Sequence, residues 1–445
     1  MNQEISSTKK EKLLAPGVIF PFILITSLFL MWGLANNMTD TLLAAFKRIM
    51  SMKDSQTAYI QVVFYGAGYG LLAIPAAIFI KKYSYRSGVL LGLGLYAIGA
   101  ILFYPAKLSA DFVWFLAALW ILSAGLSILE TAANPYIISM GSEETGTRRL
   151  NLAQSFNPMG SILGVLVSQM FILSQLNTAN ASERAAMSAG ELEKIQAGEL
   201  NAVTTTYVVV GIILVAIWFI IAFYKKMPKT SEAGGPLHLG ATFKRLVKNK
   251  NYMWGVVAQF FYVGAQIGVW SYTIRYVMQE LRLEQIVLPV GKTPEQMAAT
   301  YYLASLILFT VSRFICTWLM RYITPANLLK ILSGLAIVFT IMVIYVGGRI
   351  GVYSLVGISG CMSLMFPTIF GLACRGLGED TKIAGSGLIM AILGGAILTQ
   401  LQGWVSDKTH SIQLAYWVPL GCFAIIAFYG LMMSKKYLNH GNSAS

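Results

Sequence analysis

Two carboxylic acids lie in apolar stretches of the sequence, where charge is costly. Asp40 is followed by the apolar residues Leu42–Phe46, and Glu130 follows the mostly apolar run Phe112–Leu129. A charge at the centre of a bilayer costs about 2.5–3.5 kcal/mol even on the most forgiving scale, so such residues usually serve a function. Burial disfavours the charged form of a carboxyl group and lets it exchange a proton near neutral pH. The alternative for Asp40 is a carboxylate near a helix end that only reaches water.

The three histidines do not offer a competing proton carrier. They are His238, His410 and His440, and all fall in polar segments or at the end of the chain. We therefore expect Asp40 and Glu130 to be the proton-coupling groups.

Amide side chains are expected at the depth of Glu130. Asn134 lies one helical turn after Glu130, and Gln154 and Asn157 lie near the start of the next apolar run. Consecutive spans run in opposite directions with a rise of about 1.5 Å per residue, so these four side chains reach a similar depth. We expect a polar binding layer here. The alternative is that the amides only join helices to one another.

A second polar stripe follows the middle of the chain. Gln259, Tyr262, Gln266 and Trp270 are spaced by three, four and four residues, which places them on one face of a helix. Amides bond to hydroxyl groups, and flat aromatic faces cover the C–H surface of a sugar ring. The stripe is typical of a sugar-binding face, although a buried helix interface can produce the same pattern.

Two arginines also fall within apolar segments. Arg275 lies close to the outer end of its helix, which favours a side chain that reaches up to the membrane surface. Arg313 lies near the inner end of its helix. It either pairs with a carbonyl or carboxylate group in a gate or has a purely structural role.

The elements that carry these residues are membrane spans. The chain has 445 residues, of which 56% are hydrophobic and only 12% charged, whereas a soluble domain has about a quarter of its residues charged. Because one span needs about 20 apolar residues, the chain has room for roughly a dozen. The four cysteines lie in apolar segments and imply no disulfide framework.

The apolar runs divide into two sets of six. They begin near residues Val18, Ala58, Gly88, Phe112, Leu150 and Ala202, and then near Trp254, Met297, Leu328, Val352, Ile383 and Ile412. We expect an all-α membrane protein of twelve transmembrane helices, with an N-terminal half over residues 1–224, a basic cytoplasmic linker over 225–252 and a C-terminal half over 253–445. This two-half arrangement is typical of parallel repeats in transporters.

The distribution of Lys and Arg predicts the orientation. With both termini in the cytoplasm, 21 of the 33 Lys and Arg lie inside, 10 lie outside, and two fall within spans. Cytoplasmic loops carry the excess of positive charge, so this count favours cytoplasmic termini. It also accounts for the basic composition without a nucleic-acid partner.

Six short stretches make the chain similar to a known family. They are NNMTD (Asn36–Asp40), LETAANP (Leu129–Pro135), RLNLAQSFN (Arg149–Asn157), AQFFYVGAQ (Ala258–Gln266), WSYTIRY (Trp270–Tyr276) and FPTIF (Phe366–Phe370). The chain resembles the major facilitator superfamily and, within it, the bacterial fucose:H⁺ symporter family. The likeness runs from about Pro21 to Tyr429.

The resemblance implies a sugar site between two six-helix halves and uptake driven by protons. It points to Asp40 as the proton-coupling carboxylate, to Glu130 as a second protonatable group, and to Asn37, Gln154 and Asn157 as sugar contacts. The implied substrate is L-fucose or a related hexose, since close relatives carry glucose, galactose or N-acetylglucosamine. We expect a protein of the bacterial inner membrane, monomeric, that uses no cofactor besides the coupling proton.

Three other functions fit the sequence less well. A membrane enzyme is disfavoured because the sequence has no HExxH, GxSxG or Walker A motif. A drug/proton antiporter of the same fold usually has a cavity lined by aromatic side chains instead of amides. A passive sugar facilitator has no need of Asp40.

Overall fold

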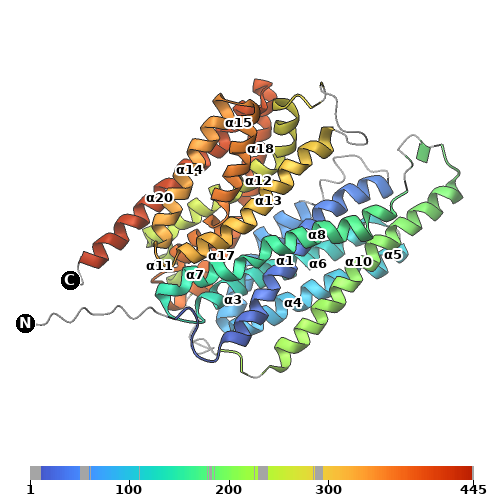
Figure 1. Cartoon of the computed structure of the whole chain (residues 1–445). Helices are drawn as coiled ribbons and strands as arrows, with labels where there is room; N and C mark the ends of the chain where they lie inside the picture. The colour runs from blue at the N-terminus through green and yellow to red at the C-terminus, as the bar shows by residue number, and fades with distance from the viewer. Residues whose placement is uncertain are drawn as a thin grey trace, which may run out of the picture.

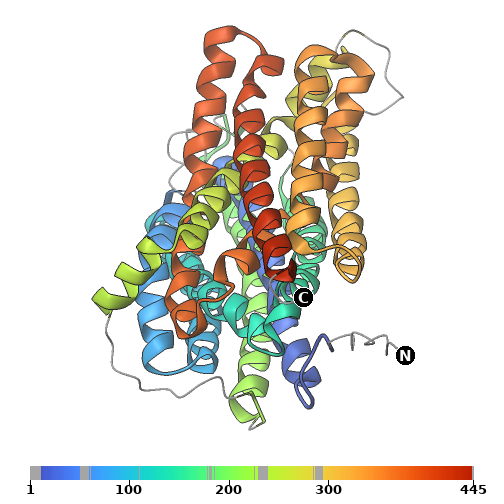
Figure 2. The same ribbon diagram turned by 90° about the vertical axis from the view of Figure 1, so that its left-hand side faces the viewer.

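The protein is a bundle of long helices. The computed structural model describes residues 12–50, 60, 62–109, 111–177, 179, 183–184, 186–224, 226–228, 239–283, 285 and 294–442, and these contain helices and no strands. Figures 1 and 2 show two groups of helices, with the early part of the chain in one and the later part in the other.

The N-terminal half contains the helices up to residue 223. They are α1 (Ile19–Ile49), the π-helix η1 (Val62–Gly70), α3 (Leu71–Lys82), α4 (Tyr85–Ile101), α5 (Phe103–Ser109), α6 (Phe112–Ile138), α7 (Glu143–Gln154), α8 (Phe156–Phe171), the 3₁₀ turn η2 (Leu173–Gln175) and α10 (Ala189–Phe223).

A short helix, α11 (Leu239–Lys248), precedes the C-terminal half. That half consists of α12 (Lys250–Glu280), α13 (Pro294–Leu319), α14 (Pro325–Tyr345), α15 (Gly348–Met362), α16 (Met365–Cys374), the 3₁₀ turn η3 (Gly378–Asp380), α17 (Thr381–Met390), α18 (Leu393–Thr409), α19 (Ile412–Ala415) and α20 (Trp417–Asn442).

These helices fit the expected twelve spans. Nine helical stretches of the described chain are long and apolar enough to cross a membrane. The other three expected spans coincide with η1 and α3, with α7 and α8, and with α12. Polar residues lower the hydropathy of α7 and α12. All four cysteines are free and buried.

Two helices begin earlier than expected. The run expected from Leu150 begins as α7 at Glu143, and the run expected from Ala202 begins as α10 at Ala189. Their first turns are polar and therefore escape a search for apolar residues. In α10 a capping box between Ser188 and Glu191 satisfies free backbone N–H groups and starts the helix before the apolar run.

The two halves pack together at the end of the molecule that carries α11, which we call the linker face. The apolar core of the N-terminal half includes Phe370 of α16 and Ile383 of α17, both from the other half. Asn151 Nδ2 donates to Thr368 Oγ1 across the halves at 3.1 Å, and the Gly376 backbone N–H donates to Glu143 Oε1. The halves are therefore closed against each other on this face.

The helix α11 also joins the halves. Arg245 makes two hydrogen bonds of 2.7 Å to the carboxylate of Asp380, while Thr242 accepts a bond of 2.9 Å from Lys81 of α3. The bond to Asp380 favours the charged guanidinium and raises the pKa of Arg245.

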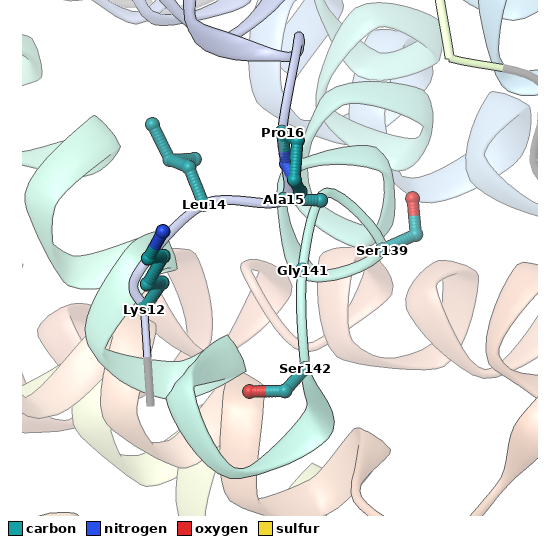
Figure 3. A pocket seen from close by; sticks show the side chains of 7 residues that line it. All are labelled: Lys12, Leu14, Ala15, Pro16, Ser139, Gly141 and Ser142. Carbon is teal, nitrogen blue, oxygen red and sulfur yellow. The ribbon is translucent and has the colours of Figure 1, made fainter. Parts of the chain in front are cut away.

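The segment before α1 is held on the same face by Arg149. This fully buried side chain donates from Nε to the Ile137 carbonyl and from Nη1 to the Leu13 carbonyl, both at 2.7 Å. Figure 3 shows a pocket beside this segment, which has a volume of about 390 Å³ and is lined by residues that include Lys12 and Ser142. None of the residues that line it belongs to the predicted binding layer.

Candidate transport site

The structure brings together the carboxyl and amide groups of the N-terminal half. Glu130 and Asn134 of α6 and Gln154 of α7 are all at least 95% buried. Gln154 Nε2 donates to Asn134 Oδ1 at 2.7 Å, and Asn134 Nδ2 donates to the Glu130 carbonyl at 3.0 Å. The depth argument therefore predicted three members of one connected layer.

Sequence reasoning missed Tyr69, a direct partner of Glu130. Its hydroxyl donates to Glu130 Oε1 at 2.8 Å, whereas Glu130 Oε2 has no partner among the described residues. Tyr69 belongs to η1, and short π-helical stretches often mark functional sites. The only signal in the sequence is a tyrosine among the glycines Gly66, Gly68 and Gly70, which does not identify its partner.

Asn157 of α8 and Asn37 of α1 each bond to a backbone carbonyl of α1. Asn157 Nδ2 donates to the Phe29 carbonyl and Asn37 Nδ2 to the Gly33 carbonyl, both at 3.3 Å. Both side chains are half-buried. The side chain of Asp40 lies outside the described part of the structure, so its expected role stays a prediction.

The close approach of α1 and α8 depends on small residues. A Cβ atom placed on Gly164 would lie 2.5 Å from the Leu34 carbonyl oxygen, which leaves no room for a larger side chain. Close packing at small residues is common between membrane helices. It holds Asn157 and the helix of Asn37 side by side.

The polar stripe of α12 is in place, but two of its members bond within their own half. The Tyr262 hydroxyl donates to the Met362 carbonyl and the Trp270 indole N–H to Ser359 Oγ, both at 3.2 Å. Gln259 is fully buried, and neither polar atom of its amide has a partner among the described residues. Gln266 is half-buried.

The two arginines differ in their surroundings. Arg275 is exposed near the end of α12 and lies over the ring of Tyr272, as expected for a side chain that reaches the surface. Arg313 is 3% exposed and donates to backbone carbonyls of both halves. Of the alternatives left open for Arg313, the structure favours pairing with carbonyl groups.

A buried carboxyl group beside a pair of hydrogen-bonded amides can bind a polyhydroxylated molecule and respond to a proton. Amides both donate and accept hydrogen bonds, as sugar hydroxyl groups do. The site lies in a bundle of helices arranged in two halves, and nine helical stretches of the described chain are long and apolar enough to cross a membrane. This arrangement is that of a multi-span membrane transporter.

Comparison with known proteins identifies the family. The model of the Major Facilitator Superfamily matches residues 22–399, so the chain belongs to this superfamily. It is 40% identical over 435 residues to the L-fucose-proton symporter of Haemophilus influenzae, which covers 95% of this chain and 99% of that protein. A glucose/galactose transporter of Brucella abortus is 32% identical over 417 residues, or 94% of this chain and 95% of the relative.

A solved structure agrees in fold over nearly the whole chain. The crystal structure of the Escherichia coli fucose:proton symporter matches with a TM-score of 0.85 and 36% sequence identity. The match covers 93% of this chain and 98% of the other. The resemblance read from the sequence motifs is thereby confirmed.

Proposed function

We propose that this protein is a proton-coupled symporter that imports L-fucose by alternating access. The observation that carries the proposal is a buried polar cluster in a superfamily member 40% identical to an L-fucose-proton symporter. In this cluster Tyr69 bonds to the carboxyl group of Glu130, while Asn134 bonds to the backbone carbonyl of Glu130 and to Gln154. No cofactor besides the proton is needed, because binding energy and the proton gradient drive transport without covalent chemistry.

The sugar site in this proposal lies between the two halves. The N-terminal half contributes the amides of Asn37, Asn134, Gln154 and Asn157. The C-terminal half contributes the stripe of α12, in which Gln259 and Gln266 offer amides to the hydroxyl groups. Tyr262 and Trp270, whose polar atoms bond within their own half, offer ring faces to the C–H surface of the sugar.

The proton is proposed to act through Asp40 and Glu130. A proton that moves down 100 mV releases about 2.3 kcal/mol, enough for roughly fiftyfold accumulation of a neutral sugar. A charged, poorly solvated Asp40 would raise the barrier to reorientation of the empty carrier, and its protonation would remove that barrier. Glu130, bonded to the amide layer through its own backbone carbonyl, would respond to bound sugar.

We place the protein in the bacterial inner membrane as a monomer with both termini in the cytoplasm. The excess of Lys and Arg on the linker face supports this orientation. In that orientation, the halves are closed on the cytoplasmic side in this structure. Residues 225–252 then form a cytoplasmic linker between the halves 1–224 and 253–445.

One experiment tests the function directly. De-energised cells that produce the protein are given L-fucose, galactose, glucose, N-acetylglucosamine or arabinose, and the external pH is recorded. We expect alkalinisation with L-fucose first, because symport takes protons from outside. A response to glucose and galactose alone would favour the second candidate, supported by the glucose/galactose transporter at 32% identity. No response to any sugar would contradict proton-coupled sugar transport.

A further inference from the structure

Arg313 occupies a special position between the two halves. It lies on α13 of the C-terminal half, is 3% exposed, and donates from Nη1 to the Gln154 carbonyl of the N-terminal half at 2.9 Å. From Nε it donates to the Ser363 carbonyl of its own half. One guanidinium therefore joins two backbone carbonyls that belong to different halves.

Prolines explain why both carbonyls are available. In an α-helix a carbonyl accepts a bond from the N–H four residues later, and proline has no N–H. The residues four positions after Gln154 and Ser363 are Pro158 and Pro367. Helix breaks coincide with these positions, since α7 ends at Gln154 and α15 ends at Met362. An unpaired carbonyl at membrane depth is costly, and Arg313 satisfies both.

The bond across the halves should be strong, because no described carboxylate lies within ion-pair distance of Arg313. An arginine side chain keeps its charge in proteins, so a buried one requires acceptors. The guanidinium also lies over the ring of Phe309, with its carbon 4.6 Å from the centroid. If the halves separated on the linker face, Arg313 would lose the Gln154 carbonyl.

Gln154 connects this bond to the binding layer. Its carbonyl accepts from Arg313 while its side chain donates to Asn134. We propose that Arg313 is the latch that holds the linker face closed. It donates hydrogen bonds to two backbone carbonyls, one in each half, that proline leaves without a helical partner. Its connection to bound sugar through Gln154 rests on the proposed function, but the latch itself does not.

The test measures separation of the halves without any sugar. Spin labels are attached to Glu144→Cys and Glu379→Cys, two exposed positions on the linker face, one in each half. The four native cysteines are buried and should label slowly. Pulsed electron resonance on the full chain in nanodiscs then gives the distances between the labels. We expect one short distance in the parent protein.

Removal of the latch should add a second, longer distance. Loss of a hydrogen bond to a charged donor is expected to raise the open-to-closed ratio about tenfold or more in Arg313→Met. Pro158→Ala restores an N–H that competes for the Gln154 carbonyl, and should shift the distances in the same direction. The matched controls are Arg275→Met, an exposed arginine, and Pro75→Ala, a proline inside α3, and both should keep the parent distance.

The outcomes are decisive in either direction. A longer distance in Arg313→Met with both controls unchanged supports the latch. A single short distance in Arg313→Met, equal to that of the parent, overturns it. If Arg313→Met yields too little folded protein, Arg313→Lys decides, because lysine keeps the charge but not the planar fork that reaches two carbonyls. Unchanged distances in Arg313→Lys would then overturn the proposal. Failure of sugar transport would leave this result untouched.

Discussion

The hydroxyl of Tyr69 donates a hydrogen bond to Oε1 of Glu130 at 2.8 Å, deep inside the N-terminal half. The other carboxyl oxygen has no partner among the described residues. The orientation of the carboxyl group therefore depends on one hydroxyl from a π-helical segment. Because Glu130 also lies next to the amide layer, this bond places a protonatable group beside the proposed sugar site.

Tyr69→Phe should impair coupling more than folding. Removal of one partner from a buried polar group costs roughly 1–3 kcal/mol, and here the group is a carboxyl. We expect at least about a fivefold loss of uphill uptake, measured with radiolabelled sugar in energised vesicles. Tyr96→Phe is the control, because it also removes a buried hydroxyl group, one that donates to the Met31 carbonyl of α1 instead of to Glu130. Equal uptake by Tyr69→Phe and the parent protein would contradict a role for this bond.

Gln154→Ala and Asn157→Ala should weaken sugar binding while the fold is kept. Each removes an amide from a desolvated site at a cost of roughly 1–3 kcal/mol, or about a five- to hundredfold loss of affinity. Calorimetric titration of the purified protein measures it. Gln196→Ala on α10, which loses a bond to the Ile49 carbonyl of α1, should bind sugar normally. If both variants keep the parent affinity, the amides serve only to pack helices.

Asp40→Asn should separate exchange from accumulation. Asparagine imitates the protonated carboxyl group at all times, so the carrier can reorient without a proton. We expect sugar exchange across vesicle membranes to persist, while uphill uptake and sugar-linked proton entry disappear. Asp111→Asn is the control, an exposed residue that caps α6. Full uphill uptake by Asp40→Asn would move the coupling role to Glu130.

Two ion pairs should differ greatly in their effect on stability. Arg184 and Glu199 are each 2% exposed, and removal of one partner from a buried pair costs about 3–5 kcal/mol. Arg184→Ala should therefore lower the thermal unfolding midpoint clearly. Arg245→Ala should lower it far less, because the Arg245 side chain is 59% exposed. Similar midpoints for the two variants would show that the Arg184 pair is not isolated from water.

The orientation is tested by cysteine labelling from outside intact cells. Glu193→Cys lies in the exposed first turns of α10, and Lys244→Cys lies on the exposed side of α11. The charge bias predicts that an impermeant reagent labels the first and not the second. Labelling of Lys244→Cys from outside would contradict cytoplasmic termini, and permeabilised cells supply the control in which both label.

The sequence by itself determined the spans and the depth of the polar groups. Apolar length sets where a chain can cross a membrane, and the constant rise of a helix converts residue number into depth. These two facts sufficed to place Glu130, Asn134 and Gln154 at one level, where the structure joins them by hydrogen bonds. The polar first turns of α7 and α10 escaped the same reasoning, because it searched only for apolar residues. In α10 a capping box starts the helix before the apolar run.

Only the tertiary structure decided which helix faces which. Depth does not report the rotation of a helix or the identity of its neighbour, so nothing in the sequence paired Tyr69 with Glu130. Pro158 and Pro367 reveal from the sequence that two carbonyls lack helical partners. Only the packing of α13 against the N-terminal half brings the guanidinium of Arg313 to both carbonyls, Gln154 and Ser363. Such a contact joins residues far apart in the chain, so the sequence does not reveal it.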